Sequence, residues 1–225
     1  MQLVLLAVIP ALIIIFYVNI NDKYDKEPKH LLVFSFLMGA IISILFASVL
    51  YLLTQSLVPF QVIEKQSVWQ LFIKAFFMVG FIEEFSKYII VRYYAQPKRE
   101  FNEQFDGIIY AVMVSMGFAT TENVMYVFEG GLQTALLRMF TAVPAHATFA
   151  VIMGYFLGKA KFSQKKTYYN LVGLLSAIFF HGAYDFFLFL DFIPGIWLGA
   201  FVSLFLGLYL SKKAMQAHSD NSRFK

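Results

Sequence analysis

Residues 31–53 read LLVFSFLMGAIISILFASVLYLL, a run without one charged side chain. An α-helix needs roughly 20 apolar residues to cross the hydrocarbon core of a bilayer, and this run is long enough. Over the whole chain of 225 residues, 60% are hydrophobic and 14% are charged, whereas a typical soluble domain has about 25% charged residues. The chain is therefore predicted to be an integral membrane protein.

Further apolar blocks lie on both sides of that run. We predict an all-α polytopic bundle of about seven transmembrane helices, forming a single domain over residues 1–225. The first block lacks a basic n-region and a small-residue cleavage site, so we expect a retained span rather than a signal peptide. The predicted spans are residues 3–20, 31–53, 67–92, 106–128, 134–158, 168–190 and 193–211.

The basic residues predict the orientation of the spans, because Lys and Arg concentrate in cytoplasmic loops. The segments opposite the basic ones hold only Lys65 and Arg138, while Lys74 and Lys87 lie inside the third block. We therefore predict an outside N-terminus and a cytoplasmic C-terminus. The other 14 of the 18 basic residues follow or border blocks 1, 3, 5 and 7: Lys23, Lys26, Lys29, Arg92, Lys98, Arg99, Lys159, Lys161, Lys165, Lys166, Lys212, Lys213, Arg223 and Lys225.

Two features of composition narrow the function. The chain has no cysteine, which excludes disulfides, thiolate metal sites and cysteine nucleophiles. Its net charge of +4 is modest and reflects the basic loops, so nucleic acid is not an expected partner.

Polar residues inside the apolar blocks are the candidates for function. A charged side chain at the bilayer centre costs about 2.5–3.5 kcal/mol on insertion scales, so such residues are usually functional. A simple ion pair between Glu83 and Lys87, four residues apart, is an alternative, and so is a hydrogen-bonded core role for each histidine. Polar residues in four consecutive blocks instead favour one shared site. They are Glu83, Glu84, Lys87, Glu122, Asn123, His146, His181 and Asp185.

The spacing of these residues predicts how they face. His181 and Asp185 are four residues apart and should share one helix face, whereas Glu83 and Glu84 should point about 100° apart. One glutamate can then face a cavity while the other anchors Lys87 or a neighbouring helix. Pro144 lies two residues before His146, and either a kink or an exposed carbonyl at the site would explain it.

Carboxylates and histidines without cysteine suit the activation of a water molecule. A glutamate would be the general base, and histidines would polarise a carbonyl or bind a metal. The sequence has no His-Glu-x-x-His and no Gly-x-Ser-x-Gly, which argues against zincin and rhomboid-like sites. Tyr184-Asp185 matches half of an aspartyl intramembrane protease signature, but the Gly-x-Gly-Asp half is absent.

In order and in separate blocks, these motifs resemble the PrsW family of bacterial membrane proteases. That family is distantly related to the CAAX prenyl-protease and bacteriocin-processing proteins. The resemblance covers most of the chain. Its motifs here are Asp22-Lys-Tyr-Asp-Lys-Glu-Pro28, Phe81-Ile-Glu-Glu-Phe-Ser-Lys87, Phe105-Asp-Gly-Ile-Ile-Tyr110, Gly117-Phe-Ala-Thr-Thr-Glu-Asn123, Pro144-Ala-His146 and His181-Gly-Ala-Tyr-Asp185.

The resemblance implies a function in the cell membrane of a bacterium. Proteases of this family make the first, or site-1, cut in a single-span anti-sigma factor, on its extracytoplasmic side. A second intramembrane protease, the site-2 protease, then acts on the product in the stress response. The implied catalytic residues are Glu83, Glu84, Glu122, His146, His181 and Asp185, with Lys87 and Asn123 in support.

The resemblance also implies a role for each site residue, although two positions differ from those of the CAAX relatives. Glu83 and Glu122 would activate water, while His181 and Asp185 would stabilise the oxyanion or hold a metal. The relatives usually have His where this chain has Glu122, and Asn where it has Asp185. An extra carboxylate favours a cation or a shared proton. One hypothesis is therefore a divalent metal such as zinc, bound by Glu122, His146 and His181.

Two other functions fit the same residues. One is a membrane protease of the CAAX or bacteriocin-processing type that acts on a different substrate. The other is a non-enzymatic, ion-coupled transporter, because buried carboxylates and histidines also form proton relays. Seven spans without inverted halves argue against the transporter.

Overall fold

The computed structural model describes residues 2–57 and 67–225, and these residues form helices and no strands. The predicted all-α class is confirmed. Two residues between the predicted spans 31–53 and 67–92, the basic Lys65 and the proline Pro59, lie outside the described residues. The α-helices are α1 (Gln2–Asn21), α2 (Lys29–Leu37), α3 (Ile44–Leu57), α4 (Val68–Ile73), α5 (Phe81–Ile90), α6 (Phe105–Phe140), α7 (Ala142–Lys161), α8 (Lys166–Phe189) and α9 (Leu198–Asp220).

Short π-helical segments join some of these helices into longer rods. Segment η1 (Met38–Ser43) links α2 to α3, η3 (Lys74–Gly80) links α4 to α5, and η4 (Val91–Ala95) extends α5. Such π segments are frequent at functional sites, and η3 directly precedes the helix that carries Glu83 and Glu84. Two of the predicted spans, 31–53 and 67–92, thus correspond to composite rods.

Five helical segments are long and apolar enough to cross a membrane: Gln2–Asn21, Lys29–Ser56, Phe105–Lys161, Lys166–Phe189 and Leu198–Asp220. The multi-pass class is therefore confirmed. The segment Phe105–Lys161 contains both α6 and α7, while the rod from α4 to η4 carries several charged residues and is not among the five. A count of seven spans remains a prediction, as does the orientation.

The ends of the predicted spans differ from the helices in two places. Helix α6 is broken at Gly131 (φ 69°, ψ −154°), in the predicted gap between blocks 106–128 and 134–158, and its second part runs on to Phe140. The block 134–158 is divided again at Thr141, before α7 begins at Ala142. The block 193–211 begins too early, since Pro194 and Gly195, the latter with φ of 79°, lie in the turn before α9. Pro144 lies in the first turn of α7, where its missing N–H has no intrahelical partner to lose. It marks a helix start rather than a kink.

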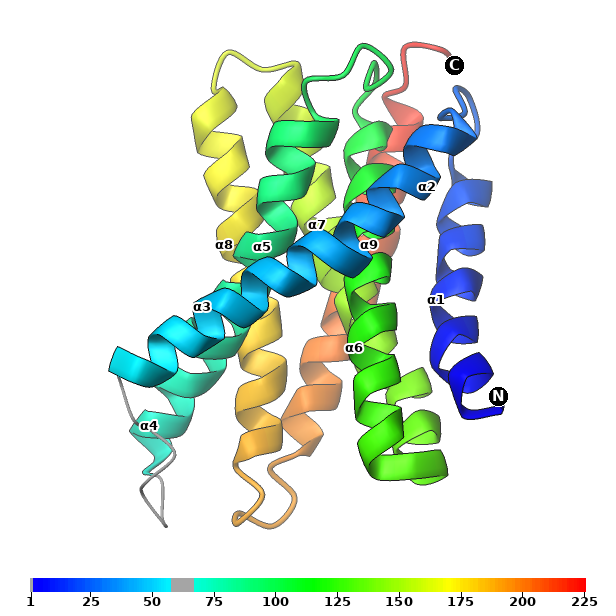
Figure 1. Ribbon diagram of the computed structural model, residues 1–225. Coiled ribbons are helices and arrows are strands. Elements are labelled where there is room, and N and C mark those ends of the chain that lie inside the picture. The colour runs from blue at the N-terminus through cyan, green and yellow to red at the C-terminus, as the bar shows by residue number, and fades with distance from the viewer. Residues whose placement is uncertain (1, 58–66) are drawn as a thin grey trace.

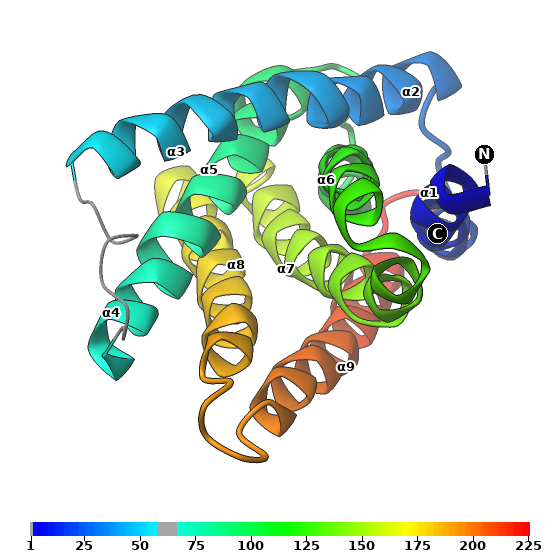
Figure 2. The same cartoon turned by 60° about the horizontal axis from the view of Figure 1, so that its bottom comes forward.

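Helices α6 and α7 form the centre of the bundle, and the other helices surround them (Figure 2). Their backbones touch through glycines: a Cβ atom on Gly107 would lie 2.4 Å from the carbonyl oxygen of Gly154 and 2.5 Å from the nitrogen of Gly158. Small residues of this kind let membrane helices approach closely. This contact sets the spacing between the helices that carry Glu122 and His146.

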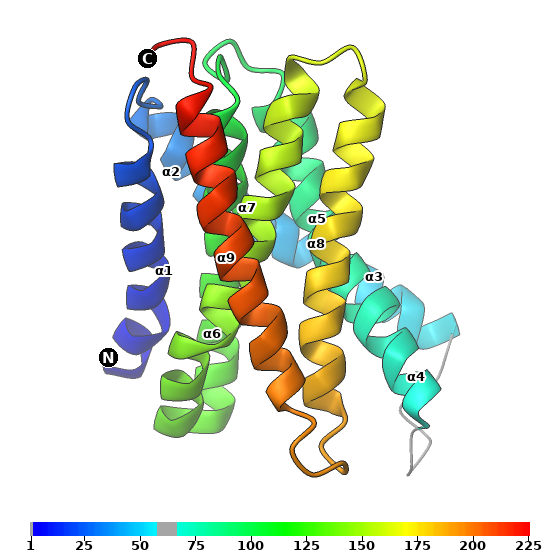
Figure 3. The same cartoon turned by 180° about the vertical axis from the view of Figure 1, so that it is seen from behind.

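The connections α1–α2, η4–α6 and α7–α8 lie at one end of the bundle together with the C-terminus (Figures 1 and 3). Most of the basic residues belong to these segments or to the ends of the helices beside them. By sequence, Arg138 was counted with the segments opposite the basic ones. It lies in the last turn of α6 and pairs with Glu122 inside the protein.

Candidate active site

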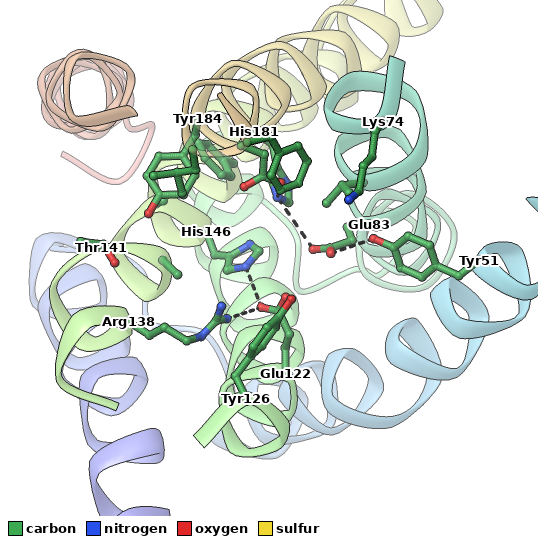
Figure 4. A pocket seen from close by; sticks show the side chains of 17 residues that line it. Tyr51, Lys74, Glu83, Glu122, Tyr126, Arg138, Thr141, His146, His181 and Tyr184 are labelled. Carbon is green, nitrogen blue, oxygen red and sulfur yellow. Dashed lines mark hydrogen bonds and ion pairs between the residues drawn. The ribbon is translucent and has the colours of Figure 1, made fainter. Parts of the chain in front are cut away.

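The polar residues predicted to share a site do meet inside the bundle. Helix α5 supplies Glu83, Glu84 and Lys87, α6 supplies Glu122 and Asn123, α7 supplies His146, and α8 supplies His181 and Asp185. Their side chains are linked by hydrogen bonds and ion pairs across the four helices (Figure 4). The residues thus form one connected polar cluster.

The adjacent glutamates of α5 point to different partners. Glu83 lines the central cavity, and its Oε1 atom accepts a hydrogen bond of 3.0 Å from the Tyr51 hydroxyl of α3. Glu84 is fully buried away from the cavity, and its Oε1 atom accepts a bond of 2.7 Å from Lys87. One glutamate faces the cavity and the other anchors Lys87, as their 100° offset predicts.

Lys87 joins α5 to α7. Its ammonium group lies 2.7 Å from Glu84, 3.6 Å from Glu83 and 3.2 Å from Nδ1 of His146. It also lies 4.2 Å from the ring centroid of Phe118 on α6. The ion pair with Glu83 therefore exists, but Lys87 contacts several helices, which a pair confined to one helix would not require.

The partners of His146 fix which of its ring nitrogens carries the proton. Lys87 can only donate, so Nδ1 of His146 accepts. The other nitrogen, Nε2, lies 3.0 Å from Oε2 of Glu122 and donates to it. A neutral imidazole protonated on Nε2 satisfies both contacts.

His181 carries its proton on the other ring nitrogen, Nδ1. Its Nδ1 lies 2.8 Å from Oε1 of Glu84, and a buried carboxylate accepts a proton-bearing nitrogen best, so Nδ1–H donates. Its Nε2 then carries a lone pair when the ring is neutral, and it lies 3.3 Å from Asp185 and 3.9 Å from Glu83. The ring stacks on Phe149, with centroids 4.9 Å apart. Glu84 thereby orients His181 so that its Nε2 faces Glu83 and Asp185.

Arg138 is a site residue that sequence reasoning missed. Its Nη2 atom donates to Oε2 of Glu122 at 2.7 Å, and its Nε atom donates to the side-chain oxygen of Asn123 at 2.8 Å. The guanidinium lies 4.1 Å from the ring centroid of Tyr126. Asn123 in turn donates to the carbonyl of Ala7 on α1. The supporting role of Asn123 is thus to position Arg138 and to tie α6 to α1.

We expect Arg138→Gln to destabilise the protein. The variant leaves the Glu122 carboxylate without its guanidinium partner, and breaking a buried pair costs about 3–5 kcal/mol. Each side chain is 16% exposed, so about 2–3 kcal/mol is expected here, or roughly 5–10 °C in Tm. Thermal unfolding of the purified protein measures this. The matched control, Arg99→Gln at an exposed loop position, should leave Tm unchanged. Equal Tm values for the two variants would contradict this role of Arg138.

A cavity of about 450 Å³ lies at the centre of the cluster. Glu83, Glu122, His146, His181 and Asp185 line it together with apolar and aromatic side chains. A second cavity of about 300 Å³ lies between α3 and α6. The two cavities share Tyr51, Glu83, Glu122 and Tyr126. The site is therefore open to a ligand that approaches between α3 and α6.

The cluster suits a divalent metal, as two observations show. One ligand atom each from Glu83, His146 and His181 lies within 4.8 Å of the other two. Oε2 of Glu83 is buried and has no hydrogen-bond partner. The metal set predicted from sequence differs in one residue: the structure groups Glu83 with the two histidines, while Glu122 is bound by Arg138 and His146.

The net charge of the site also favours a bound cation. Glu83, Glu84, Glu122 and Asp185 face the two side-chain cations Lys87 and Arg138. With neutral histidines, two negative charges have no partner, and an uncompensated buried charge is costly. A bound cation or added protons would offset them.

A membrane bundle with carboxylates and imidazoles around a buried cavity is an arrangement suited to hydrolysis within the membrane. The model of the PrsW family intramembrane metalloprotease matches residues 27–211. The chain belongs to this family, and it is a multi-pass membrane peptidase.

Individual relatives support the assignment. The chain is 34% identical to Protease PrsW of Geobacillus kaustophilus over 203 residues, which is 89% of this chain and 86% of the relative. It is 36% identical to Protease PrsW of Clostridioides difficile over 199 residues, covering 85% and 81%. For Protease PrsW of Bacillus subtilis the values are 35% over 182 residues, covering 80% and 79%. No solved structure shows a significant match.

Proposed function

We propose that this protein makes the site-1 cut in a single-span anti-sigma factor, using a glutamate to activate water. The observation that carries the chemistry is Glu83, whose buried Oε2 atom has no hydrogen-bond partner and whose side chain faces the cavity. The choice of substrate rests on the family, whose members resemble this chain over most of its length.

Glu83 is placed to act as the general base. Tyr51 fixes the carboxylate through Oε1, which leaves Oε2 to accept a proton from a water molecule in the cavity. The water oxygen then attacks the peptide carbonyl carbon. When the C–N bond breaks, Glu83 returns the proton to the leaving amine. The groups available to stabilise the oxyanion are the donors that line the cavity, namely the imidazoles of His146 and His181 and the guanidinium of Arg138.

The surrounding residues position Glu83 and its neighbours. Glu84 and Lys87 hold the two histidine rings, while Arg138 holds Glu122 against His146. A divalent metal held by Glu83, His146 and His181 would polarise the carbonyl and acidify the attacking water. His146 would then bind the metal through a ring nitrogen released from its contact with Lys87 or Glu122. Glu83 offers two oxygens, so binding through one leaves the other able to accept a proton.

The cavities suit a peptide segment that enters from the bilayer. The second cavity leads from Glu83 and Glu122 between α3 and α6 and is lined by Ala47, Ser48 and Met125. A single-span substrate could place an unwound segment there, since water and polar groups in the site can satisfy its backbone. This arrangement favours a membrane-embedded protein over a free soluble peptide.

The test is cleavage of a candidate anti-sigma factor by the purified protein in liposomes. We expect one cut on the extracytoplasmic side of the substrate's span, mapped by mass spectrometry. In cells that lack the protein, the anti-sigma factor should stay full length and the site-2 protease should leave it uncut. If the protein cleaves only prenylated or bacteriocin-like peptides, it is instead a protease of the CAAX or bacteriocin-processing type. Ion movement across the liposomes without any cleavage would contradict the proposal.

A further inference from the structure

A second polar cluster, with no residue in common with the proposed active site, is formed by the α1–α2 connection and the segment before α6. Both segments lie at the same end of the bundle (Figure 1). Five acidic residues from two segments gather there: Asp22, Asp25, Glu27, Glu103 and Asp106. Three of these belong to the motif 22–28 and one to the motif 105–110, two motifs to which the proposed chemistry gives no role.

The contacts show that the two segments form one cluster. Asn102 donates to Asp25 at 2.7 Å, and its backbone N–H donates to Oδ2 of Asp106 at 2.6 Å. The Tyr110 hydroxyl donates to Glu27, which lies beside Asp106. Ser222, near the C-terminus, donates to Glu103. The α1–α2 connection, the segment before α6 and the C-terminal segment therefore meet here.

The cluster is buried, and its carboxylates form no ion pairs with the cations beside them. Asp22, Glu27, Glu103 and Asp106 are each at most 7% exposed. None of the five carboxylates forms an ion pair with a lysine or arginine in the part of the chain that the structure describes. The nearby ammonium groups of Lys26 and Lys161 donate instead to backbone carbonyls. Burial of several unpaired carboxylates is strongly unfavourable.

Unused oxygen atoms indicate what is missing. Both carboxylate oxygens of Asp22 are buried and have no hydrogen-bond partner, and the same holds for Oδ1 of Asp106 and Oδ1 of Asn102. Burial raises the pKa of Asp22 to about 7; Lys26 opposes the rise, while Glu103 and Asp25 add to it. Burial likewise raises the pKa of Glu27 to about 7, although the Tyr110 hydroxyl opposes the rise. The unused oxygens of Asp22, Asp106 and Asn102 thus lack a partner in the described part of the chain.

We propose that this cluster binds a hard divalent cation, Mg²⁺ or Ca²⁺, at a site separate from the active site. Such ions take carboxylate and amide oxygens as ligands, and Asp22, Asp106 and Asn102 offer unused oxygens of both kinds. The absence of imidazole or thiolate from the cluster disfavours zinc. The ion would bind the α1–α2 connection to the start of α6, the helix that carries Glu122.

The test uses the full-length protein, freed of metal with a chelator and titrated with MgCl₂ or CaCl₂ alone. Binding is followed by calorimetry and by Tm. We expect heat of binding and a rise in Tm of about 5 °C at saturation. Asp22→Asn should reduce the affinity at least tenfold, because the amide keeps the shape of the side chain but loses its charge.

The variant is suited to this test because the side chain of Asp22 makes no hydrogen bond that the substitution would break. Without cations, Asp22→Asn should therefore be at least as stable as the wild type. Asp220→Asn, whose side chain is 75% exposed, is the matched control and should respond like the wild type. No response of the wild type to millimolar Mg²⁺ and Ca²⁺, or an unchanged response of Asp22→Asn, would overturn the proposal. Neither readout depends on proteolysis.

Discussion

Glu83→Gln is expected to lower the rate of substrate cleavage by about 10³-fold while the protein remains folded in the membrane. Loss of a general base typically costs 10²–10⁴-fold, and glutamine keeps the hydrogen bond from Tyr51 that Glu83 accepts. We expect no unfolding, because Oε2 of Glu83 has no hydrogen-bond partner and Lys87, which loses its 3.6 Å ion pair with Glu83, keeps the closer contact of 2.7 Å with Glu84. Initial rates of cleavage in liposomes and Tm of the same preparation measure the two effects.

The variant Glu84→Gln tests whether the two adjacent glutamates have different roles. Glu84 receives the ammonium of Lys87 and Nδ1–H of His181, so its loss should reduce Tm as well as activity. Asp191→Asn, at an exposed position between α8 and α9, is the control for a carboxylate lost far from the cavity. Full activity of Glu83→Gln would remove Glu83 from the mechanism, and a larger fall in Tm for Glu83→Gln than for Glu84→Gln would reverse their roles.

Removal of divalent metal by a chelator is the second large effect expected. Cleavage should fall by more than about 100-fold, because metal activation of water lowers the activation barrier by several kcal/mol. A stoichiometric amount of Zn²⁺ should restore it. His181→Ala should bind less metal, measured by elemental analysis, and should stay inactive after Zn²⁺ is added. His218→Ala, which alters a histidine on α9 that contacts Tyr155, should retain its active-site metal. Full activity of the chelated, metal-free protein would exclude a metal role.

Much of the fold could be predicted from the sequence because the bilayer imposes a simple rule. Uncharged runs such as residues 31–53 can only be buried in lipid or protein, and they became helices. The rule does not say where a helix ends when apolar residues continue past its end. The block 134–158 therefore concealed the boundary at Thr141, and the block 193–211 extended into the turn at Gly195.

The site was predicted as a set of residues but not as a set of contacts. Charged side chains in apolar blocks are conspicuous, so Glu83, Glu122 and His181 stood out. Tyr51 did not, because a tyrosine in an apolar run is ordinary packing until a carboxylate is found beside it. Helical geometry separated Glu83 from Glu84 by angle, but only the packing of α5 against α3 and α8 shows which one faces the cavity.

Arg138 illustrates a different limit. A lone arginine near the start of an apolar block, here 134–158, resembles a residue at a helix end, and only three-dimensional proximity reveals its partner. One consequence concerns how the protein enters the membrane during synthesis. Glu122 and Arg138 lie on either side of the break at Gly131 within α6, so they can neutralise each other before the later helices arrive. This part of the nascent chain would then be inserted without a net charge from this pair, which lowers the cost of carrying a carboxylate into lipid.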